Sequence, residues 1–138
     1  MYGPDWDAGC PVCTAHMKAM GGLDSLAERD TTFAIVARAP IHKINAYKAT
    51  TGIRFPFYSS YRSSFNFDMD MSSVDGGEGQ GMSVFFQMNG NVYHTYTAQQ
   101  RGVEGITNVD AFLDITPYGR QQDFEDSPAG WPQRPTYE

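Results

Sequence analysis

The sequence predicts an α/β fold, on the basis of three local patterns in the 138-residue chain. Cys10 and Cys13 form a C-x-x-C pair where a helix is expected to begin. The β-branched and aromatic run at residues 31–39 is typical of a buried strand, and a helical pattern follows it. Asn89-Gly90, a dipeptide that favours a two-residue type I′ turn, separates two strand-like segments and predicts a β-hairpin.

The first helix is expected to start directly after the first cysteine. Glycine and proline keep residues 1–9 in a loop, and apolar spacing then predicts a helix from Pro11 to about Glu28. Gly21 and Gly22 interrupt that pattern, so a kink or two short helices are both compatible with it.

The elements after the predicted strand follow from turn residues and periodicity. Pro40 stands at a predicted first helical position, and this second helix is expected to end at Gly52. Residues 54–70 should hold a short extended segment and then an irregular stretch, and a flexible loop should lead into the hairpin strands 82–88 and 91–97. A final helix is predicted at residues 103–115, 13 positions that prolines and glycines bound on the C-terminal side.

This order of elements matches the thioredoxin-like fold, a three-layer α/β/α sandwich with a mixed sheet. In that fold a central strand leads into the C-x-x-C, and residues 1–6, which contain Gly3 and Pro4, are too few and too irregular to supply it. We therefore expect a domain at 1–120 that lacks its N-terminal central strand, followed by an extended or disordered tail at 121–138. The two unpaired strand edges predict a homodimer in which a partner chain completes the sheet.

Composition excludes several functional classes. Ten Lys and Arg against sixteen Asp and Glu give a net charge of −6, and such a surface disfavours nucleic acid as a partner. No apolar stretch is long enough to cross a bilayer, and Asp5 and Asp7 stand where a signal peptide would need a basic and then an apolar run. No membrane partner is expected, and a cytoplasmic location is predicted.

The paired cysteines are best interpreted as a redox centre. Cys10, beside the first amides of a helix, would be favoured as a thiolate, which is the nucleophile in disulfide exchange. Cys13, one turn along, could attack the resulting mixed disulfide, and Pro11 fits a first turn that needs no amide donor. The expected substrate is a thiol or disulfide, in a protein or a small molecule, and no cofactor is required.

Two other interpretations stay open. The cysteines could be small apolar residues of a packed helix. Alternatively, Cys10, Cys13 and His16 could be three ligands of a metal site in a non-catalytic binding module or scaffold, although zinc usually takes four. Haem attachment is excluded because Thr14, and not histidine, follows the second cysteine.

Several segments together resemble the DUF899 family of bacterial proteins, namely MYGPDWDAGCPVC, RAPIHKINAYK, FPFYSSY, FNFD, VYHTYT, RGVE and LDITPYGRQ. The resemblance covers nearly the whole chain. It implies a thioredoxin-like fold, a dithiol-disulfide oxidoreductase activity, and Cys10 with Cys13 as the redox centre. The resemblance also implies that family members carry a further N-terminal region before the GPDW segment.

The same comparison of folds suggests where a substrate would bind. Thioredoxin-like oxidoreductases generally place a cis-proline opposite the cysteines, before the first hairpin strand, and Met82-Ser83 hold that place here. Trp6, just ahead of the cysteines, and Arg38, a candidate for holding an anionic group, complete the expected substrate-binding set. Because that proline is absent, peroxide reduction and adventitious metal binding also stay open as alternatives to general disulfide exchange.

Overall fold

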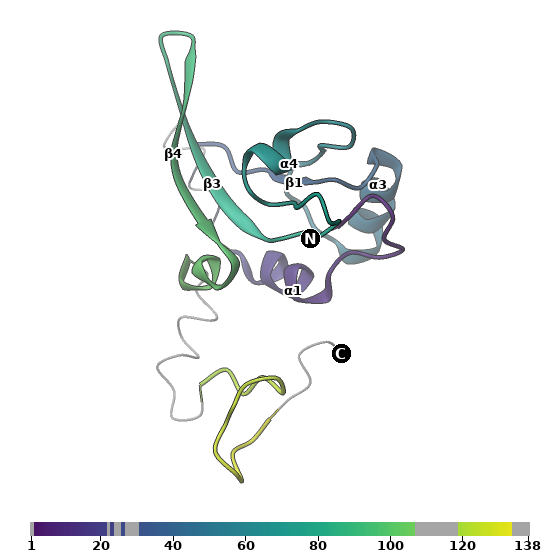
Figure 1. The fold of residues 1–138 in the computed structure, drawn as a ribbon, viewed down its shortest axis with the longest axis vertical. Coiled ribbons are helices and arrows are strands. Elements are labelled where there is room, and N and C mark those ends of the chain that lie inside the picture. The colour runs from purple at the N-terminus through teal and green to yellow at the C-terminus, as the bar shows by residue number, and fades with distance from the viewer. Residues whose placement is uncertain (1, 22, 24–25, 27–30, 107–118, 134–138) are drawn as a thin grey trace.

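The computed structural model describes residues 2–21, 23, 26, 31–106 and 119–133. Helices and strands both occur, so the predicted α/β class is confirmed. In chain order the described elements are α1 Pro11–Ala19, β1 Ile35–Ala37, α3 Ile41–Thr51, β2 Phe57–Ser59, α4 Phe65–Asp68, β3 Gly81–Met88, β4 Asn91–Gln99 and the 3-10 helix η1 Gln100–Ile106 (Figure 1).

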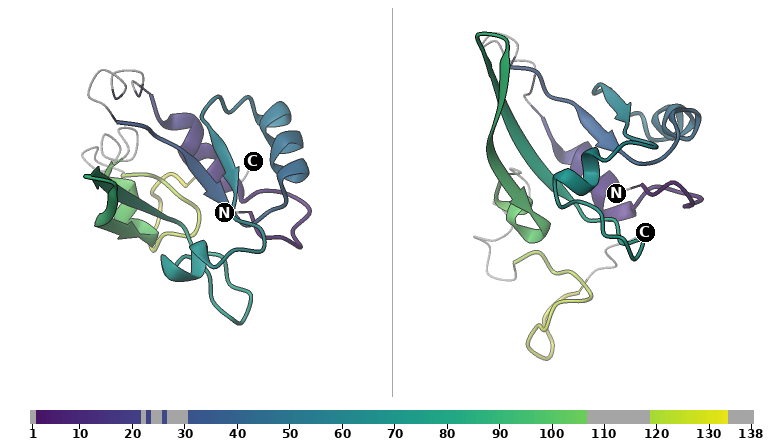
Figure 2. Two further views of the ribbon diagram at one scale, coloured as in Figure 1. Left: turned by 90° about the horizontal axis from the view of Figure 1, so that it is seen from above. Right: turned by 45° about the horizontal axis from the view of Figure 1, so that its top comes forward.

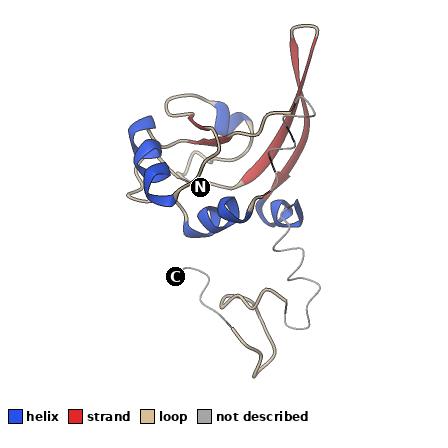
Figure 3. Ribbon diagram, turned by 180° about the vertical axis from the view of Figure 1, so that it is seen from behind, coloured by secondary structure: helices blue, strands red, loops and turns tan. Residues whose placement is uncertain are grey.

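The four strands form a parallel pair and an antiparallel pair. β1 pairs with β2 in parallel, with Ile35 opposite Phe57, and α3 connects the two strands and packs against β2 (Figure 2). β3 and β4 form the predicted antiparallel hairpin. Within the described residues these pairs are two separate sheets, shown as the red arrows of Figure 3.

The hydrophobic core lies around the parallel pair. α1 contributes Met17, α3 contributes Ile44, and the strands contribute Ile35, Ala37 and Phe57. The N-terminal loop also belongs to this core, because the buried Tyr2 side chain joins it and the Tyr2 carbonyl accepts a hydrogen bond of 3.0 Å from the Ala39 amide. The core therefore fixes α1, which begins with the cysteine pair, against β1 and α3.

The two predicted helices form, with different bounds. α1 ends at Ala19 and not near Glu28, because its capping residue Met20 is already extended and glycine follows. α3 begins at Ile41, and Pro40 is its N-cap residue and not its first helical position. Gly52 ends α3 as predicted, in the left-handed conformation (φ 73°) with its amide donating to the Lys48 carbonyl.

The aromatic stretch at 54–70 is more regular than predicted. It holds β2 and also the short helix α4, where the sequence pattern predicts an irregular stretch. Ser64 is the N-cap residue of α4. Its hydroxyl makes no capping bond to a backbone amide and donates instead to the Asp68 carboxylate at 2.7 Å. The predicted final helix is described only at its start, as part of η1, since residues 107–118 lie outside the described ranges.

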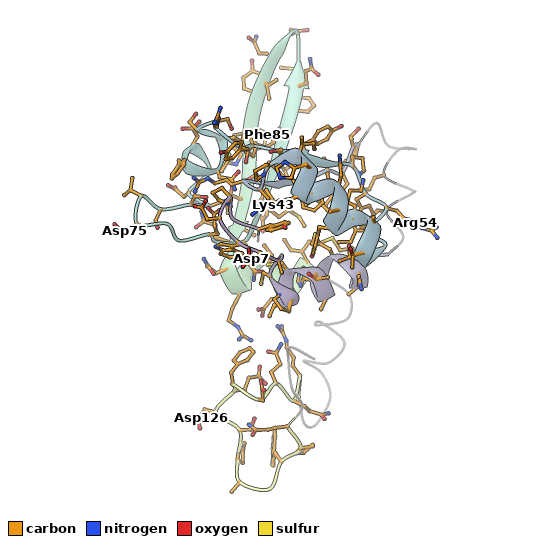
Figure 4. All side chains as sticks on the ribbon, turned by 90° about the vertical axis from the view of Figure 1, so that its right-hand side faces the viewer. Asp7, Lys43, Arg54, Asp75, Phe85 and Asp126 are labelled. Atoms are coloured by element: carbon orange, nitrogen blue, oxygen red, sulfur yellow. The ribbon has the colours of Figure 1, made fainter. Side chains whose placement is uncertain are left out.

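The hairpin projects from the rest of the protein (Figure 1). Asn89 and Gly90 both have positive φ, 53° and 79°, which is the conformation that a type I′ turn requires. A register shift after Val84 marks a bulge, and near it the ring of Phe85 lies 6.3 Å from that of Phe65 in α4 (Figure 4). No helix among the described residues has the length and apolarity needed to cross a membrane.

The cysteine pair at the start of helix α1

Cys10 is the N-cap residue of α1, and the helix begins at Pro11 as predicted. Its carbonyl accepts two hydrogen bonds from Thr14, one from the amide at 3.0 Å and one from the hydroxyl at 2.8 Å. The Cys10 side chain makes no capping bond of its own, so its half-exposed sulfur stays available for chemistry.

Cys13 lies one turn further on in a different environment. Its side chain is buried, and its Sγ–H donates to the Oε1 atom of Gln80 at 3.3 Å. The pKa of Cys13 is raised to about 11, mainly by burial, and the neighbouring Cys10 contributes to this rise. Cys13 is therefore held as a thiol at neutral pH, which leaves Cys10 as the sulfur positioned to attack.

Tyr47 of α3 forms the wall beside the pair. Its hydroxyl shares a short hydrogen bond with the Thr14 hydroxyl, which in turn donates to the Cys10 carbonyl. Burial raises the pKa of Tyr47, so the phenol stays protonated. Gly9 allows this approach, because a Cβ atom there would come within 2.7 Å of the Tyr47 ring.

The expected anion-binding residue, Arg38, is already paired. Its guanidinium lies 2.6 Å from the carboxylate of Glu78, whose side chain is 3% exposed, and it stacks over the Phe67 ring at 4.5 Å from the centroid. Glu78 also accepts from the Ser72 hydroxyl at 2.8 Å. The Arg38–Glu78 ion pair therefore joins the end of β1 to the loop before β3, at a position two residues before Gln80.

The other predicted substrate-binding residues lie around the site without meeting at one point. Trp6 packs over Gly3 in the N-terminal loop, and its carbonyl accepts from Lys43 Nζ at 2.9 Å (Figure 4). Met82 and Ser83 lie inside β3, and the Ser83 hydroxyl bonds to that of Thr97 on the paired strand. The residue that the loop before β3 brings to the cysteines is Gln80, which the sequence analysis did not select.

The metal alternative gains no support from the geometry. Within the part of the chain that the structure describes, no three His, Cys, Asp or Glu side chains gather closely enough to hold a metal ion. Cys10 and Cys13 are close to each other, but His16 does not extend the pair into a cluster of that kind.

The unequal cysteines predict an order of alkylation. In the reduced protein at about pH 8, iodoacetamide should label Cys10 and leave Cys13 unmodified, because Cys13 becomes a thiolate only as the pH approaches about 11. The Cys13 labelling rate should rise about tenfold per pH unit below that value. Peptide mass spectrometry measures both rates, with the unfolded protein in denaturant as the control that labels both residues alike. Equal labelling of the two cysteines in the folded protein at pH 8 would contradict the assignment.

Comparison with known proteins identifies a family. The family described as "Bacterial protein of unknown function (DUF899)" matches residues 1–137. No curated protein matches the chain significantly, and no solved structure does.

Proposed function

The chain belongs to the DUF899 family, and from this membership and the geometry of its cysteine pair we propose that it is a thiol-disulfide oxidoreductase with a thioredoxin-like fold. One observation carries the proposal. Two free cysteines stand at the start of α1, Cys10 half-exposed at the N-cap and Cys13 buried and held as a thiol. Disulfide exchange needs this division between an attacking and a resolving sulfur.

The reaction proceeds in two exchanges. The Cys10 thiolate attacks one sulfur of a substrate disulfide, so that a Cys10–substrate bond forms, the substrate S–S bond breaks, and the departing sulfur takes up a proton. Cys13 then loses its proton to solvent and attacks Cys10 Sγ, which releases the second substrate thiol. The substrate gains two electrons and two protons, and Cys10 and Cys13 become a disulfide, which an external thiol reduces again.

The thioredoxin-like architecture is part of this proposal. The chain runs from the cysteine helix α1 through the parallel strand β1 and helix α3 to an antiparallel hairpin, which is the order expected of a three-layer α/β/α sandwich. The segment before β3 reaches the cysteines, as a substrate-binding loop must in that fold. The reducing cytoplasm is the proposed location, since a thiol pool there can regenerate the dithiol.

Thiol release from a model disulfide tests the proposal. The reduced protein, freed of reductant, is mixed with an excess of the chromogenic disulfide 5,5′-dithiobis(2-nitrobenzoate). It should release two thiolates per chain and end with an internal disulfide and no free cysteine. Release without an internal disulfide, with the reagent left bound to both sulfurs, would contradict the proposal.

We further propose that the functional unit is a homodimer in which the two chains contact each other through their β3–β4 hairpins. Both faces of this hairpin expose large apolar side chains, among them Phe86 (53% exposed), Val92 (65%) and Tyr96 (52%). Residues 79–100 contain no Asp, Glu, Lys or Arg in a chain of net charge −6. This uncharged surface is where two like-charged copies can meet without repulsion, and its open strand edges can pair.

Substitution of one hairpin residue tests the dimer. The wild type should sediment as a dimer at micromolar concentration, and Phe86→Glu should shift it to the monomer, because two introduced carboxylates would be buried close together. Val74→Glu is the matched control, since Val74 lies in a loop and is 96% exposed, and it should leave the dimer intact. A wild type that sediments as a monomer would overturn the proposal.

A further inference from the structure

Gln80 holds a fixed position beside the resolving cysteine. It directly precedes β3, and its carbonyl accepts a hydrogen bond of 2.9 Å from the Gln100 amide, which extends the hairpin ladder by one step. The hairpin therefore fixes the backbone from which the Gln80 side chain reaches back to α1. Its Oε1 atom accepts from Cys13 Sγ at 3.3 Å, across 67 positions of sequence.

Cys13 Sγ lies near both the Gln80 amide and the Cys10 side chain. Cys10 is close enough to raise the pKa of Cys13, while Gln80 Oε1 accepts a hydrogen bond from the Cys13 thiol. An acceptor for the S–H group favours the thiol over the thiolate, and its direction fixes the side-chain rotamer of Cys13. An uncharged amide does this without placing a negative charge beside a sulfur that must later lose its proton.

We infer that Gln80 is a positioning residue for the second exchange, an inference that rests on the proposed oxidoreductase function. In the resting dithiol it accepts a hydrogen bond from the Cys13 thiol, which adds to the effect of the burial that keeps Cys13 protonated. In the mixed disulfide it keeps Cys13 Sγ within reach of Cys10, so that the substrate is released before a second thiol can intervene. Gln80 acts on the exchange through its hydrogen bond to Cys13 Sγ.

Two substitutions of similar size separate these effects. Gln80→Met removes the acceptor and keeps the bulk, so Cys13 should ionise at lower pH. Compared at equal thiolate fraction, the second exchange should then slow about fivefold to tenfold, the range that one hydrogen bond accounts for. Gln80→Glu keeps an acceptor but adds a charge beside Cys13, so the pH dependence of the second exchange should move to higher pH. The first exchange, made by Cys10, should stay within about twofold in both variants.

Stopped-flow kinetics with the same chromogenic disulfide resolves the two exchanges as two phases of thiolate release. Gln133→Met and Gln133→Glu are the matched controls, because Gln133 is exposed and lies outside both the hairpin and the cysteine site, and both should leave the two phases unchanged. An unchanged second phase in both Gln80 variants would overturn the inference, as would equal slowing of both phases, which indicates a general structural effect.

A second measurement keeps the inference testable if the protein exchanges no disulfide at all. In a Cys10→Ala background, Gln80→Glu should raise the pH at which Cys13 is alkylated, and Gln133→Glu should not. An absent first phase in the wild type would contradict the oxidoreductase function alone, whereas an unmoved alkylation profile in Gln80→Glu would contradict the role of Gln80 alone.

Discussion

Replacing Cys10 with alanine is expected to abolish disulfide exchange at neutral pH, with a loss of at least about a thousandfold in the rate of thiolate release. Cys10 is the half-exposed sulfur at the N-cap of α1, and the Cys13 that remains is buried, which raises its pKa and keeps it a thiol at pH 7. The rate is measured with the chromogenic disulfide over the first turnover.

Replacing Cys13 with alanine should instead stop the reaction halfway. Cys10 attacks and keeps its new partner, so one thiolate is released per chain and a stable mixed disulfide accumulates, which intact mass spectrometry detects as one reagent moiety. Ser63→Ala, at an exposed position outside the hairpin, is a control that leaves both cysteines in place. Full activity in Cys10→Ala together with none in Cys13→Ala would reverse the roles and refute the assignment.

Ile44→Ala should be the most destabilising substitution of a single described core residue. Ile44 is the largest side chain that the described core buries completely, and it lies on α3 against the parallel strands. Removing its outer carbons leaves a cavity and costs about 2–5 kcal/mol of unfolding free energy. Since a small domain has only about 5–15 kcal/mol in total, the midpoint of urea unfolding should fall clearly.

The matched control lies on the same helix. Ile41 is 51% exposed, so Ile41→Ala should change the unfolding free energy by less than about 1 kcal/mol. If the two variants unfold at the same urea concentration, then α3 does not pack on the β1–β2 pair in solution, and the wall that Tyr47 forms beside the cysteines loses its support.

The features that the sequence predicted correctly are those set by local chemistry. Asn89-Gly90 defines the hairpin turn because both residues adopt positive φ, and Gly52 ends α3 for the same reason. Pro11 marks the start of α1 because its missing amide donor is not needed there. In each case neighbouring residues alone determine the backbone.

The features that the sequence did not predict depend on distant partners. The apolar run at 31–39 forms a strand only at Ile35–Ala37, because β2 offers three paired residues and no more. The helix α4 forms in a stretch whose serines and aromatics suggested irregular chain. The local sequence pattern of one strand does not show how long the strand that pairs with it will be.

The candidate site shows the same division. The spacing of Cys10 and Cys13 and their place on a helix were evident, whereas Gln80 and Tyr47 reach them from 67 and 34 positions away in sequence from Cys13, by contacts that only the fold creates. The one available signal for Gln80 was its place directly before the hairpin, where the thioredoxin-like fold puts its substrate loop. The predicted substrate-binding residues Met82 and Ser83 follow Gln80 by two and three positions, inside β3.

The most direct test of the central claim is the redox equilibrium of Cys10 and Cys13 with glutathione. The protein is equilibrated at a series of ratios of reduced to oxidised glutathione, quenched in acid, alkylated and analysed by mass spectrometry. We predict one two-electron transition from two free thiols to a Cys10–Cys13 disulfide, with a potential more oxidising than about −270 mV, the value for thioredoxin. Independent glutathione adducts on the two cysteines, with no internal disulfide at any ratio, would contradict the account.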